Sequence, residues 1–172
     1  IDHAYKWRNY YLNNTKEIPP EHILLFDEAQ RAWTKDRLTS WSSRQGERVE
    51  MSEPEAFLKI MERVSDWSVV VCLVGGGQEI NKGEGGMEEW LKAIRDYFPK
   101  WKVWISDKLD SKFYLPSFSL DQLQGRLFRK DHLHLGTSIR SFRSEKVTKF
   151  VTDLLEGNLL EAKNLLIELK SS

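Results

Sequence analysis

The feature that most constrains this chain is an apolar run that ends in two adjacent carboxylates. Residues 23–26 are Ile-Leu-Leu-Phe, and Asp27 and Glu28 follow directly. A short run of this composition is typical of a strand that is buried within a parallel sheet. Open α/β sheets bind their ligands at the carboxyl ends of such strands, so the acids would face a ligand. The alternative is an acidic helix start, because carboxylates also stabilise helix amino termini.

Two consecutive acids at a strand end suit nucleotide hydrolysis. One carboxylate holds the magnesium ion on the phosphates, and the next positions or deprotonates the attacking water. On this hypothesis Asp27 binds magnesium, and Glu28 is the catalytic base that orients the water.

A second apolar run, residues 68–74, leads into three glycines and Gln78. The glycines let the backbone approach a ligand closely, and the glutamine then lies at the carboxyl end of the strand. We expect this end to share a sheet edge with Asp27 and Glu28, where a glutamine would suit a water and a terminal phosphate. A plain strand–loop connection is the alternative.

A third segment, residues 133–141, has a strand-like pattern and delivers Arg140 just before a helix that begins near Ser144. An arginine in this position can stabilise the charge that develops on a transferred phosphoryl group. A surface or purely structural arginine is the alternative.

The order of these motifs resembles that of the superfamily-one helicases. In that family DEAQ is the magnesium and water motif, a glutamine on a following strand tip senses the γ-phosphate, and a later arginine contacts it. The resemblance implies an α/β fold of three layers, with a mostly parallel sheet flanked by helices, as in RecA-like P-loop NTPases. It also implies ATP and magnesium as cofactors, with Gln78 as sensor and Arg140 on the γ-phosphate.

The motif sequences are similar to those of a bacterial family of predicted ATPases, the domain of unknown function two-thousand-and-seventy-five. That family is related to the Schlafen-type AAA ATPases. The likeness covers roughly residues 20–160, with its segments at residues 26–33, 52–55, 73–90 and 138–143. Helicases usually have Gly-Asp in the third motif, whereas this chain has Gly75-Gly76, so the water-coupling aspartate is absent.

No phosphate-binding P-loop, G-x-x-x-x-G-K-[ST], occurs in the 172 residues. We therefore expect the chain to be a single α/β domain over residues 1–172 and an incomplete motor. The P-loop strand would lie upstream of Ile1, and any second lobe downstream of Ser172. The resemblance places the missing strand between the one that ends in Gln78 and a strand at residues 132–135.

Charge and cysteine content narrow the possible partners. Lys plus Arg and Asp plus Glu both number 26, which argues against binding to nucleic acid by bulk electrostatics alone. Trp33 and Trp41, in a segment that reads as a polar loop, are candidates for contacts with DNA or RNA. The single cysteine, Cys72, excludes an intramolecular disulfide and fits a buried thiol in the cytoplasm.

Four helices are predicted from caps and apolar spacing. Ser52 and Glu55 form a capping box that begins a helix running to about Ser65. Further helices are expected at residues 87–97, 144–155 and 159–169, whereas residues 107–131 read as irregular.

Three functions remain open. The chain would belong to a nucleic-acid-dependent ATPase, to an AAA-type switch that remodels proteins without unwinding, or to a degenerate lobe that does not hydrolyse ATP. The fold alone does not distinguish among them.

Overall fold

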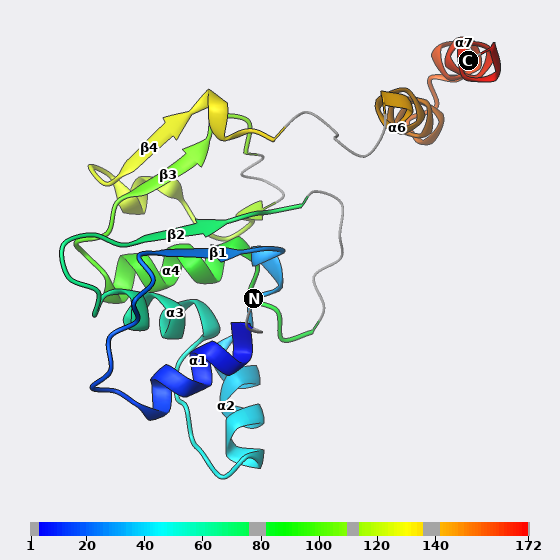
Figure 1. Cartoon of the computed structure of the whole chain (residues 1–172). Coiled ribbons are helices and arrows are strands. Elements are labelled where there is room, and N and C mark those ends of the chain that lie inside the picture. The colour runs from blue at the N-terminus through cyan, green and yellow to red at the C-terminus, as the bar shows by residue number, and fades with distance from the viewer. Residues whose placement is uncertain (1–3, 76–81, 110–113, 136–141, 172) are drawn as a thin grey trace. The chain divides into compact units, whose positions relative to one another are not determined.

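A computed structural model describes residues 4–75, 82–109, 114–135 and 142–171 (Figure 1). Strands and helices alternate along the chain, which confirms the predicted α/β class and is compatible with part of a RecA-like fold. The chain divides into two compact units, residues 1–129 and 130–172. The single domain over residues 1–172 stays a prediction. None of the described helices is long and apolar enough to cross a membrane.

The first unit contains the strands of the described residues, apart from the last residue of β4. Its helices are α1 (Ala4–Asn13), α2 (Lys35–Arg44), α3 (Glu53–Met61) and α4 (Gly86–Tyr97), with short 3-10 helices at Ala29–Arg31 and Leu120–Leu123. Its strands are β1 (Ile23–Phe26), β2 (Val69–Cys72), β3 (Val103–Ser106) and β4 (Leu127–Lys130), the last of which ends at the boundary of the unit.

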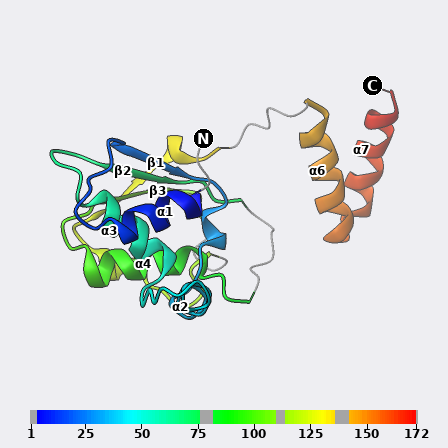
Figure 2. The ribbon, with the colours of Figure 1, turned by 60° about the horizontal axis from the view of Figure 1, so that its bottom comes forward.

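Strands β1 and β2 form a parallel pair, as the sequence predicts, in a register that runs from Ile23 opposite Val69 to Phe26 opposite Cys72. Helices α1, α3 and α4 lie on the same side of this pair (Figures 1 and 2). Because strand side chains alternate between faces, only one face of β1 packs inward. Ile23 and Leu25 are 58% and 62% exposed. The prediction that this strand is buried is therefore wrong for half of its side chains.

The covered face of β1 begins the hydrophobic core. The Phe26 ring packs edge-on against Phe57 of α3, at 5.1 Å between centroids, and against Trp90 of α4, at 5.4 Å. The same core continues to Val103 and Ile105 of β3. It therefore lies between the strands and the helices that cover them.

Strands β3 and β4 form a second two-stranded sheet that is separate from β1 and β2. The prediction that residues 107–131 are irregular is wrong for β4, and the strand predicted at residues 132–135 is also wrong. Asp131–Leu133 is a 3-10 helix. The Asp131 carboxylate accepts a hydrogen bond of 2.8 Å from the His132 N–H, and this local turn competes with an extended backbone.

The helix starts follow local rules. The Ser52 hydroxyl accepts a hydrogen bond from the Glu55 N–H, which confirms the capping box, although α3 ends at Met61 rather than near Ser65. Trp41 lies in α2 and not in a polar loop, so that prediction is wrong. Leu38 is fully buried, and its packing gives α2 an inner face that the polar sequence conceals.

The second unit is a helical hairpin that follows the 3-10 helix at Asp131–Leu133. Helix α6 (Phe142–Leu155) and helix α7 (Leu159–Ser171) contact each other along their lengths. Gly157, with a φ of +81°, lies between the two helices and ends α6. The Lys146 ammonium lies 2.9 Å from the Glu168 carboxylate and ties the two helices together.

Candidate functional site

The two acids lie in a tight turn directly after β1. The Asp27 side chain is exposed, whereas Glu28 is half-buried. Asp27 Oδ1 accepts a hydrogen bond of 2.9 Å from the Glu28 N–H. Glu28 has a φ of 55° and a ψ of 45°, which is the left-handed conformation. A residue with a Cβ adopts it at a cost of roughly 1–2 kcal/mol, and such residues concentrate at functional sites.

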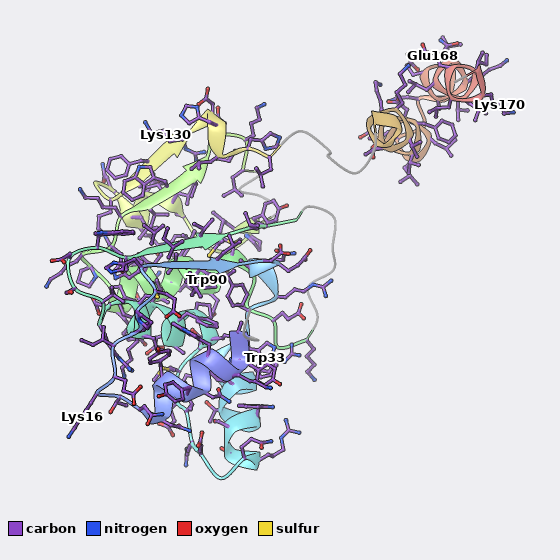
Figure 3. The ribbon with its side chains drawn as sticks, in the orientation of Figure 1. Lys16, Trp33, Trp90, Lys130, Glu168 and Lys170 are labelled. Carbon is purple, nitrogen blue, oxygen red and sulfur yellow. The ribbon has the colours of Figure 1, made fainter. Side chains whose placement is uncertain are left out.

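The turn is held from both sides by β2 and α4. The Leu73 N–H donates to the Phe26 carbonyl at 2.9 Å, and the Ala29 N–H donates to the Leu73 carbonyl at 2.8 Å. The Trp90 indole N–H then donates to the Ala29 carbonyl at 2.9 Å. Figure 3 labels Trp90 on the side of the strands that α4 covers. These bonds fix the backbone on both sides of Glu28 and so favour its left-handed conformation.

The carboxyl end of β2 lies against the acidic turn. A Cβ built on Gly75 would lie 3.8 Å from Glu28 Oε1 and 3.8 Å from the Gln30 amide nitrogen. The acids and the start of the glycine segment therefore share one edge of the β1–β2 pair. Gln78 and Arg140 lie outside the described residues, so their positions at this edge remain predictions.

Gln30 is a component of the site that the sequence reasoning missed. It is 2% exposed, and its amide nitrogen donates to Glu28 Oε2 at 2.7 Å. Its amide oxygen, Oε1, is buried and has no hydrogen-bond partner among the described residues. The Arg31 guanidinium lies 3.6 Å from Glu28 Oε2, but both of these side chains are more than 40% exposed. The one sequence signal for Gln30 is its place two residues after Glu28 in the DEAQ motif.

The segment that follows the glycine turn returns to the acidic motif. The Gly85 N–H donates to the Ala32 carbonyl at 2.7 Å, and the Thr34 N–H donates to the Gly83 carbonyl at 3.0 Å. Gly83 has a φ of +89°, and a Cβ there would lie only 2.9 Å from the Arg37 side chain. Both flanks of residues 76–81 are thus attached near the acidic motif, at Gly75 and at residues 83–85.

Trp33 and Trp41, the predicted nucleic-acid contacts, surround a buried cation. Their rings meet edge-on at 5.9 Å, and the Arg8 guanidinium carbon lies 5.6 Å from the centre of each ring. The Arg37 guanidinium lies 4.6 Å from the Trp33 ring. Both indoles are half-buried, and Figure 3 labels Trp33 near the lower helices. Distances of this size are those of cation–π contacts.

Arg8 is also paired with Glu53 in a buried ion pair that the sequence does not reveal. Arg8 Nη1 donates to Glu53 Oε1, and Glu53 Oε2 accepts a hydrogen bond of 2.9 Å from the Trp33 N–H. Arg8 is fully buried and Glu53 is 7% exposed. Burial lowers the pKa of Arg8 and raises the pKa of Glu53, and the attraction between the two charges opposes both shifts. The pair connects α1, α3 and the segment after the acidic motif.

The donor set of the turn fits a magnesium ion that is held mainly by a nucleotide. Among the described residues no three His, Cys, Asp or Glu side chains gather as a metal-binding cluster. Magnesium on a nucleotide takes most of its ligands from waters and phosphates, with one or two carboxylates from the protein. An exposed Asp27 carboxylate at a strand end meets that requirement.

Comparison with known proteins adds one match. A family model described as "Schlafen group 3, DNA/RNA helicase domain" matches residues 2–170. No curated protein and no solved structure matches the chain.

Proposed function

The chain belongs to the Schlafen group 3 DNA/RNA helicase domain family. On this premise we propose that it supplies the residues that hydrolyse ATP in a motor that acts on nucleic acid. The observation that carries the proposal is the turn after β1. It presents an exposed Asp27 beside a left-handed Glu28, and the end of β2 lies against it. Two adjacent acids at such an edge are the arrangement that phosphoryl transfer to water needs.

Each acid has a separate role in this mechanism. The exposed Asp27 carboxylate would hold the magnesium ion, which neutralises phosphate charge when it is bound. Glu28 would orient the attacking water and accept its proton. The left-handed backbone and the Gln30 hydrogen bond direct the Glu28 side chain toward the Gly75 side of the edge. An unconstrained glutamate would lose this orientation.

Gln78 and Arg140 complete the proposed site as the sensor and the γ-phosphate contact. Gln78 is three residues beyond Gly75, and three residues span at most about 11 Å, which supports a place near Glu28. The proposed role of Arg140 is supported only by the order of the motifs. Kinship with the bacterial domain of unknown function two-thousand-and-seventy-five and a cytoplasmic location likewise stay predictions.

Nucleic acid is the proposed partner on the strength of the family description. Trp33 and Trp41 remain candidates for base stacking, because each indole is still partly exposed. Their contacts with Arg8 and Arg37 reduce the ring surface that a base could use. Alanine substitution at an aromatic side chain on which a base stacks weakens single-strand binding by about 1–3 kcal/mol.

The test is ATP hydrolysis by the full-length protein with and without single-stranded DNA or RNA. We expect magnesium-dependent hydrolysis that nucleic acid stimulates. Hydrolysis without stimulation would instead indicate the AAA-type switch that remodels proteins. Absence of hydrolysis under all conditions would indicate the degenerate lobe and would overturn the proposal.

A further inference from the structure

We propose that Gln30 is a positioning residue that holds the Glu28 carboxylate in its working orientation. The inference rests on the proposed function, because it assigns Gln30 a purpose at that same site. It goes beyond that function in naming a buried side chain that acts through Glu28.

The geometry of the contact between Gln30 and Glu28 supports this role. The Gln30 amide nitrogen lies 2.7 Å from Glu28 Oε2, and Gln30 is 2% exposed. A buried amide has few alternative rotamers, so it can fix a neighbour that is itself half-exposed. Glu28 Oε1, by contrast, lies on the Gly75 side, 3.8 Å from a Cβ built there. One oxygen is thus held by the protein, and the other is directed toward the shared edge of β1 and β2.

The amide oxygen of Gln30 supports the same role. This atom is buried without a hydrogen-bond partner among the described residues. A buried glutamine that served only stability would have both ends of its amide satisfied, because an unpaired buried acceptor destabilises the fold. Rotating the amide by half a turn would bring its oxygen against the carboxylate oxygen. The orientation seen is therefore the one that the Glu28 carboxylate requires, even though it leaves Oε1 without a partner among the described residues.

Arg31 does not substitute for Gln30 in this role. Its guanidinium lies farther from Glu28 Oε2, at 3.6 Å, and it is exposed to solvent. Exposed pairs of this kind hold a side chain weakly because water competes for both charges.

The first experiment compares Gln30→Met with a matched control, Gln124→Met, in the full-length protein. Methionine has a similar length and no amide, and Gln124 is an exposed residue after the second 3-10 helix. For Gln30→Met we expect kcat to fall about 10- to 100-fold, as for other residues that orient a ligand-binding group, with an unchanged KM for ATP. The melting temperature should change little, because the variant loses one hydrogen bond but also removes a buried acceptor that has no partner among the described residues. The control should change none of these quantities.

An unchanged kcat in Gln30→Met would overturn the inference. A fall in kcat together with a lower melting temperature would also overturn it. If Gln30→Met fails to fold, Gln30→Leu replaces it, since this smaller apolar side chain likewise cannot donate to Glu28. The same loss of kcat at unchanged KM is expected, and wild-type kcat would overturn the proposal.

A second experiment separates this inference from the proposed function. Thermal unfolding of Gln30→Met, Glu28→Ala and the double variant forms a cycle that needs no enzymatic activity. We expect non-additive shifts in melting temperature, because either substitution removes the same contact. Additive shifts would overturn the positioning role even if ATP is hydrolysed. Non-additive shifts in a protein that hydrolyses no ATP would reject the proposed function and keep the contact.

Discussion

The indole N–H of Trp90 donates a hydrogen bond of 2.9 Å to the carbonyl oxygen of Ala29, 61 residues earlier in the chain. Both residues are buried, at 2% and 0% exposure. The bond joins the centre of the hydrophobic core to the residue directly after the catalytic candidate Glu28. The shape of the acidic turn therefore depends on how α4 packs.

Trp90→Phe should destabilise the protein by about 2–3 kcal/mol, because a buried carbonyl loses its short hydrogen bond and the smaller ring leaves a cavity in the core. The Ala29 carbonyl would retain only the longer bond of 3.3 Å from the Ala32 N–H. Urea denaturation measures the change. Trp104→Phe is the control, since Trp104 is 53% exposed and should change stability little. Equal stabilities of the two variants would contradict the role of the bond.

Glu28→Gln should keep ATP binding and lower turnover about 10²- to 10⁴-fold in the full-length protein, because the water loses its base while the binding groups survive. Nucleotide affinity and single-turnover hydrolysis are the measurements. Glu62→Gln, an exposed glutamate just after α3, is the control and should behave as the wild type. Equal turnover in Glu28→Gln and wild type would remove Glu28 from the mechanism.

Glu28→Gly should be more stable than Glu28→Ala by about 1 kcal/mol, because only glycine adopts the left-handed conformation without a Cβ penalty. Both variants lose the contact with Gln30, so the difference isolates the backbone term at a φ of 55°. Thermal unfolding of the pair measures it. A more stable alanine variant would show that the protein in solution does not hold this backbone conformation.

Arg8→Met should destabilise the protein by about 3–5 kcal/mol, because it leaves the Glu53 charge buried without its partner. Glu53→Gln should do the same to Arg8. The double variant should be more stable than either single variant, since no unpaired charge remains. Denaturation of all three proteins forms the test, and a double variant as unstable as the sum of the singles would contradict the pairing.

Glu88 should contribute to the loss of stability in acid. Burial raises its pKa, but hydrogen bonds from the Ser117 hydroxyl and N–H, together with Lys92, outweigh that effect and lower the pKa from 4.5 to about 2. A carboxyl whose pKa is lower in the folded state stabilises it above pH 4.5 and loses that contribution as the pH falls toward 2. The melting temperature of Glu88→Gln should therefore vary less over this range than that of the wild type. Parallel curves would contradict the assignment.

The parallel pairing of β1 with β2 could be predicted from the sequence because local signals specify it. Apolar runs of strand length, each followed by a turn, are sufficient to indicate two neighbouring strands. The Ser52 capping box is likewise readable, since its partners are three residues apart. These elements depend on short-range chemistry.

The errors and omissions arise where distant parts of the chain decide the structure. Exposure of Ile23 and Leu25 depends on which face the helices cover, and the run itself looks the same in either case. The ion pair joins Arg8 and Glu53, which are 45 positions apart in the sequence. The local sequence around either residue does not indicate its partner. The hydrogen bond between Gln30 and Glu28 is local, but it depends on a left-handed backbone that β2 and α4 impose.

The half-covered β1–β2 pair has a consequence for how the chain behaves in solution. Both strands are four residues long and consist only of Ile, Leu, Phe, Val and Cys, with no charge and no proline to discourage further pairing. Edges of this composition act as templates for intermolecular sheets and for aggregation. Charged residues elsewhere offer limited protection, because 26 basic and 26 acidic residues leave no net repulsion between copies. Colloidal stability of this chain will therefore depend on whatever covers those two strands.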